Sequence, residues 1–166
     1  MMRRSREGRP ALALVPPLPP EPVAPSVSFC SHCGARPETT DTTSRVCRTC
    51  EFGLLLESAA EVAPAAGSAF LVLDSSLSIC AVSAAAEELL ATRETEAVNR
   101  HVTELLVPAD AEAQGRENLA VAITWAARGD EGFRRAVVRP ANTFGVRLTV
   151  RIAGCGPKRA ALVVFE

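Results

Sequence analysis

The chain has 166 residues, enough for one ordinary domain and one small module. Its 18 basic and 19 acidic residues give a net charge of −1, spread as +2 over residues 1–28, −2 over 29–66 and −1 over 67–166. With one Trp, six Phe and no Tyr, it lacks the basic footprint and the aromatic platforms of nucleic-acid binders, so composition argues against nucleic acid as a partner.

Residues 1–28 hold seven of the twelve prolines and predict a disordered, extended arm. The apolar run "ALALV" within it has five residues, fewer than the roughly 7–15 of a secretory signal. No segment approaches the roughly 20 apolar residues of a membrane span. These features predict a cytoplasmic protein without membrane contact.

Residues 29–57 form a candidate metal module. The stretch "FCSHCGARPETTDTTSRVCRTCEFG" contains two Cys-x-x-Cys pairs, Cys30 with Cys33 and Cys47 with Cys50, separated by thirteen residues. Such spacing lets four thiolates surround one ion tetrahedrally, and in a reducing compartment paired cysteines favour metal over disulfides. Because cysteine fills all four positions, the pattern predicts structural rather than catalytic Zn²⁺. Iron in the same thiolate set, a thiol switch and disulfides are the alternatives.

These cysteine pairs and their flanks resemble a zinc ribbon, a family of small binding modules. Within residues 29–53 three arginines balance three acidic side chains, which favours protein contact over DNA. His32, inside the first pair, is expected to be a solvent-exposed turn residue. The small residues 58–67 predict a linker to a second domain.

Residues 68–166 predict an α+β domain. Strands are expected at 69–74, 78–82, 133–139, 143–152 and 159–166, and helices at 83–92, in short turns before Pro108, and in the segment that contains Leu119, Ala122, Ile123 and Ala126 and ends at Gly129. Ser83 is a candidate N-cap, and Ala86, Leu89 and Leu90 are expected to share one face of the helix. Strict alternation over 143–152 predicts a sheet with one buried and one wet face.

The segment "AFLVLDSSLSICAVSAAAEELLATRETEAVNRHVTELLVPAD" resembles the start of a PAS domain, through Asp74, Ala85 or Ala86, Leu89, Arg100, Leu105, Leu106 and the Pro108–Asp110 loop. The resemblance implies a five-stranded antiparallel sheet with inserted helices, and a role in sensing or dimerisation. Ser83 and Asn99 depart from the family's usual Asn and Gly.

A PAS cavity holds haem, flavin, a metabolite or nothing, and the sequence identifies no ligand. Val102 stands where light-sensing members carry cysteine, which argues against a flavin adduct. His101, the one candidate haem ligand, is expected to be exposed or to cap a helix. Cys80 and Cys155 are expected to be small core or edge residues.

The sequence therefore predicts a non-catalytic signalling or regulatory protein with a protein partner, and with homodimerisation through residues 58–68 as a further option. One alternative is a transcription-associated factor whose ribbon contacts RNA polymerase or DNA. Another is an iron–thiolate redox carrier. If the two modules fold separately, Cys47→Ser should unfold residues 29–57 and leave 68–166 folded.

Overall fold

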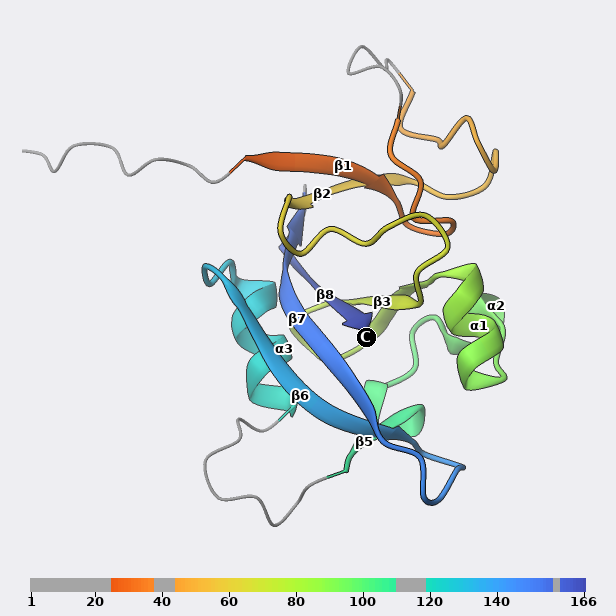
Figure 1. Ribbon diagram of the computed structural model, residues 1–166, viewed down its shortest axis with the longest axis vertical. Coiled ribbons are helices and arrows are strands. Elements are labelled where there is room, and N and C mark those ends of the chain that lie inside the picture. The colour runs from red at the N-terminus through yellow and green to blue at the C-terminus, as the bar shows by residue number, and fades with distance from the viewer. Residues whose placement is uncertain (1–24, 38–43, 110–118, 157–158) are drawn as a thin grey trace, which may run out of the picture.

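A computed structural model describes residues 25–37, 44–109, 119–156 and 159–166 (Figure 1). Of the disordered arm expected over residues 1–28, residues 1–24 lie outside the described residues, and the expectation is wrong for residues 26–28, which belong to a strand. Helices are few and short, and none among the described residues is long and apolar enough to cross a membrane. The elements in chain order are β1 (Ser26–Cys30), β2 (Leu55–Ala59), β3 (Phe70–Leu73), β4 (Ile79–Val82), α1 (Ala84–Leu90), α2 (Glu94–Ala97), the 3₁₀ turn η1 (Val102–Glu104), β5 (Leu106–Pro108), α3 (Leu119–Arg128), β6 (Phe133–Pro140), β7 (Leu148–Gly156) and β8 (Ala160–Phe165).

The eight strands of the described residues form one antiparallel sheet. Its main path is β1-β2-β7-β8-β3-β4. Strand β6 pairs with β5 and joins the edge of β7 that lies opposite β8. From β3 onward the chain runs strand, strand, helices and then three closing strands, with β5 as an added short strand. The predicted PAS-like α+β fold class is therefore confirmed.

Local sequence explains the helices. The Ser83 hydroxyl accepts a hydrogen bond from the Ala86 backbone N–H, so the predicted N-cap of α1 is present. On α3 the predicted stripe of Leu119, Ala122, Ile123 and Ala126 is buried against the sheet. Gly129 ends that helix at a φ of +91°, a backbone conformation that suits glycine.

The structure corrects or refines three expectations for the PAS-like part. Of the three residues predicted to share a face of α1, Ala86 is buried and Leu90 is partly buried against the core, whereas Leu89 is exposed. The alternating strand begins at Leu148 rather than residue 143, and Phe144 lies in the preceding turn with 85% of its surface exposed. The third concerns the wet face of the sheet: β6 and the first half of β7 alternate buried with half-buried or exposed residues as expected, but β3 is buried along its whole length.

The second face of the sheet is covered by residues that precede the predicted domain. Phe29 of β1 is fully buried and meets Phe70 of β3 edge to face, with 5.7 Å between ring centroids. It belongs to an apolar cluster that is separate from the core under the helices and comprises Phe29, Phe70, Val72, Ala81, Cys155, Leu162 and Val164.

The predicted linker is also part of the fold. Ser58 and Ala59 belong to β2, and Glu57 and Ser58 pair with Gly156 and Cys155 of β7. Val62, further along the same segment, is 1% exposed. The cysteine-bearing residues and the PAS-like residues therefore share one sheet and one apolar cluster.

Shared packing makes a prediction about stability. Phe29→Ala should lower the free energy of unfolding by about 3–5 kcal/mol, as expected for truncating a buried Phe. Denaturant unfolding followed by fluorescence of Trp125 measures the effect, because this half-exposed residue lies on α3, the helix that packs on the other core. The control Phe144→Ala should change stability by no more than about 0.5 kcal/mol. If Phe29→Ala leaves the Trp125 transition unchanged, the cysteine-bearing residues fold independently.

Candidate metal centre and adjoining groove

Two tight turns present the cysteine pairs. Cys30 ends β1, and its carbonyl accepts a hydrogen bond from the Gly34 N–H at 3.0 Å. Gly34 adopts a φ of +71°, and a Cβ there would meet the carbonyl oxygen of Ala65 at 2.5 Å, so both backbone angle and space require glycine. In the second turn, the Cys47 carbonyl accepts a hydrogen bond from the Glu51 N–H.

The turns bring the four predicted ligands together. The Sγ atoms of Cys30 and Cys50 lie 3.6 Å apart, those of Cys33 and Cys47 lie 3.9 Å apart, and all four lie within 4.8 Å of one another. With metal–sulfur bonds of about 2.3 Å, tetrahedral coordination places sulfurs roughly 3.8 Å apart. The spacing therefore fits one thiolate-bound ion. All four cysteines are free thiols, as metal binding requires.

Backbone N–H groups add to the fit by pointing at the sulfurs. His32 and Cys33 direct theirs toward Cys30 Sγ, and Gly53 directs its own toward Cys50 Sγ at 3.4 Å. Such donors stabilise thiolate charge and orient the ligands. Gly53 is held close to the sulfurs, because a Cβ there would collide with Cys30 Sγ.

Without a cation, burial and hydrogen bonding act differently on the four thiols. Burial raises the pKa of Cys30 to about 12, and it also raises the pKa of Cys33. At Cys47 the effect of burial is outweighed by hydrogen bonds from the backbone N–H groups of Cys50 and Thr49 and from Cys30, and the pKa falls to about 7. A metal ion must therefore displace protons from the first pair.

The other singled-out side chains lie outside the cluster. His101 is exposed, and its Nδ1 accepts the Thr103 N–H at the start of η1, as a capping residue does. Cys80 is exposed, whereas Cys155 is buried, which raises its pKa to about 12.

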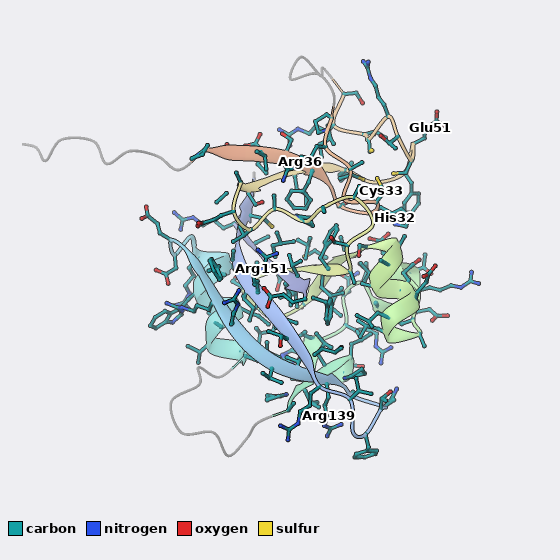
Figure 2. The ribbon with its side chains drawn as sticks, viewed as in Figure 1. His32, Cys33, Arg36, Glu51, Arg139 and Arg151 are labelled. Atoms are coloured by element: carbon teal, nitrogen blue, oxygen red, sulfur yellow. The ribbon has the colours of Figure 1, made fainter. Side chains whose placement is uncertain are left out.

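His32 is not the solvent-exposed turn residue that the sequence suggested. Its ring packs edge to face on Phe52 with 4.8 Å between centroids. The side chain is half-buried, and its Nδ1 atom is buried without a hydrogen-bond partner among the described residues. Figure 2 shows His32 and Cys33 where the cysteine loops approach α1.

A groove of about 670 Å³ lies beside the cluster, and sequence reasoning missed it. One wall comes from the cysteine loops and the other from α1, α2 and the turn between them. No local motif could reveal it, because its walls are separated by more than thirty residues. It is lined by His32, Phe52, Glu87, Glu88, Ala91, Thr92, Arg93, Glu94, Thr95 and Glu96.

Comparison with known proteins concerns the fold alone. No family model matches the sequence, and no curated protein matches it. Among solved structures, the chain is similar to the PAS domain of nitrogen regulation protein NR(II) from Vibrio parahaemolyticus, with 18% identity over 60% of this chain and 88% of that one, at a TM-score of 0.43. It is also similar to a fungal LOV domain photoreceptor, with 19% identity over 65% and 80% of the chains, at the same TM-score of 0.43. At these values the likeness carries no conclusion about function.

The sulfur geometry predicts one metal ion per chain. Cobalt(II) added to the reduced protein should give the visible and near-ultraviolet bands of tetrahedral thiolate coordination, and zinc should displace it at one equivalent. Cys47→Ser should weaken binding at least tenfold, because three thiolates remain. Cys80→Ser is the matched control and should bind as the native chain does. Equal loss in both variants would contradict the assignment of the ligands.

The pKa values predict how binding depends on pH. Burial raises the thiol pKa values of both Cys30 and Cys33, which favours their protonated forms, so zinc binding at pH 7 should release at least two protons per ion. Metal affinity should accordingly fall as the pH is lowered, because protons compete for the sulfurs. Calorimetric titration in buffers of different ionisation enthalpy measures the proton count. Release of fewer than two protons at pH 7 would show that the pair is already ionised.

Proposed function

We propose that the chain is a non-catalytic regulatory protein. Its PAS-like domain senses a signal or mediates dimerisation, and its cysteine module is a zinc-stabilised surface for a protein partner. The observation that carries the proposal is the closed four-thiol cluster, built on the same sheet as the PAS-like elements. A change at either part can therefore reach the other through β2 and β7.

Zinc in this proposal has a structural role. When bound, it supplies cross-links between the two turns, and Cys30, Cys33, Cys47 and Cys50 would hold it. Four thiolates complete a tetrahedral set, which leaves no position for a reacting water. The module has few buried apolar side chains of its own, so metal binding would contribute directly to its folding free energy.

The order of strands and helices after residue 68 supports the PAS-like role, because it is the order that the sequence resemblance implies. Between the sheet and the helices, the described part of the domain is filled with buried apolar side chains, among them Leu71, Ile79, Leu106, Ile123 and Ile152. This packing favours signalling through partner contact or sheet stability over binding of a large cofactor.

The histidines support a non-catalytic role. His101 caps η1, and its Nδ1 lies 2.7 Å from the Thr103 hydroxyl on the exposed surface, outside the groove, whereas His32 packs on Phe52. General acid–base catalysis requires a titratable side chain held within reach of a reacting group.

The role in protein contact can be tested by crosslinking in the host. We expect a specific partner to be recovered with the native chain and with Cys80→Ser, and to be lost with Cys47→Ser. Native mass spectrometry of the same samples should show one zinc per chain for the first two. A partner recovered equally with all three would contradict a role for the module in contact. An iron adduct with visible colour would replace the proposal by a redox function.

A further inference from the structure

The groove beside the metal cluster is strongly acidic. Four glutamates and one arginine line it, which gives these side chains a net charge of −3. Two of the glutamates are fixed by backbone contacts: Glu94 accepts the Val82 N–H at 3.0 Å, and Glu87 accepts the Glu94 N–H. Among the described residues, the exposed carboxylates of Glu88 and Glu96 have no ion-pair partner. They are available to a cation.

The groove also offers an aromatic surface. Phe52 is 62% exposed although it lies in a folded turn, and its ring is supported by His32. An aromatic ring close to carboxylates suits guanidinium groups, which stack on rings and form two-pronged hydrogen bonds with carboxylates. Four thiolates around a divalent ion have a formal charge of −2, so the metal-loaded module adds negative potential beside the groove. The chemistry selects an arginine-bearing peptide.

The chain itself contains such a segment. Residues 1–10, "MMRRSREGRP", contain four arginines and one glutamate, a net charge of +3 that matches the charge of the groove with opposite sign. We propose that the arginine segment, Arg3 to Arg9, binds in this groove of its own chain and occupies it until a partner displaces it.

The connecting chain is long enough for this contact. His32 lies two residues beyond the five-residue strand β1, so the groove is about 20 Å from Pro25. Residues 16–25 contain six prolines and span about 31 Å if fully extended as polyproline. The six residues 10–15 span up to about 20 Å. Residues 10–25 can therefore span up to about 51 Å, which is enough for the arginine segment to reach the groove.

Tethering compensates for modest intrinsic affinity. A segment joined to its site by a linker of this length has an effective concentration of about 1 mM, so contacts too weak to hold a free peptide are mostly formed within the chain. The contact should weaken with added salt, because Glu88 and Glu96 are exposed and salt screens such charges.

The test uses the full, zinc-loaded chain and amide chemical shifts. Replacing Arg3, Arg4, Arg6 and Arg9 by Gln should shift the amide signals of residues 92–96, and Glu88→Gln with Glu96→Gln should shift them in the same direction. The matched control replaces the exposed Glu61 and Glu131 by Gln and should leave these signals in place. The Trp125 indole signal reports folding in all variants, since α3 lies on the other side of the domain from α1 and α2 (Figure 1).

A synthetic peptide of residues 1–12 provides a second measurement. It should return the groove signals of the four-arginine variant to their native positions, and about tenfold more peptide should be needed to compete with the tethered segment of the native chain. Phe52→Ala should weaken peptide binding at least fivefold while retaining zinc. The proposal is overturned if the groove signals are the same in the native chain and in the variant whose four arginines are replaced by Gln. It is also overturned if the shift depends on protein concentration, because the segment would then bind the groove of a second copy. Zinc stoichiometry is unaffected by either result, so the test is independent of the metal proposal.

Discussion

Strand β1 contributes neighbouring side chains to two clusters, the four sulfurs of the candidate metal site and the apolar cluster on the sheet. Consecutive strand residues point to opposite faces, so Phe29 enters the apolar cluster against Phe70 while Cys30 enters the sulfur cluster. Both side chains are completely buried. Because a slip of one residue would exchange the two, the register of β1 on β2 must satisfy the metal ligands and the apolar cluster at once. The rest of the amino-terminal module is arranged around this requirement.

The first cysteine turn is attached to the PAS-like elements more closely than the second. The carbonyl of His32 accepts the Ala84 N–H at the start of α1, and the carbonyl of Cys33 accepts the Gly67 N–H. The second turn instead meets the first through its sulfurs, through the contact of Phe52 with His32 and, at its base, through hydrogen bonds between Ser31 and Leu54. A bound ion would therefore position the outer turn, residues 47–51, on the inner turn, residues 30–34, which the sheet already holds. Phe52, and with it one wall of the groove, depends most on the metal.

Sequence patterns predicted local features and missed those that depend on distant segments. The four clustered cysteines could be predicted because a Cys-x-x-Cys turn is encoded within four residues, and Ser83 and Gly129 mark helix ends for equally local reasons. Strand β2 carries "LLESA", too short and too mixed to reveal a strand, and it acquires that structure by pairing with β1 and β7. The expectation of a wet sheet face failed at β3 because the residue that covers this strand, Phe29, lies forty-one residues before Phe70 and within the candidate metal module.

The same long-range packing determines how metal binding can influence the PAS-like residues. Metal binding stabilises the folded chain only to the extent that the unfolded chain, or a chain in which β1 has left the sheet, binds the ion more weakly. Since Cys30 cannot leave the cluster without disturbing its neighbour Phe29, part of the metal-binding free energy is linked to burial of the face that Phe70, Leu162 and Val164 provide. Loss of the ion would act first on the outer turn and Phe52, which the sheet holds least, and would reach the apolar face only if β1 also separated. The acidic groove should therefore change its structure on loss of the metal more readily than the apolar core does.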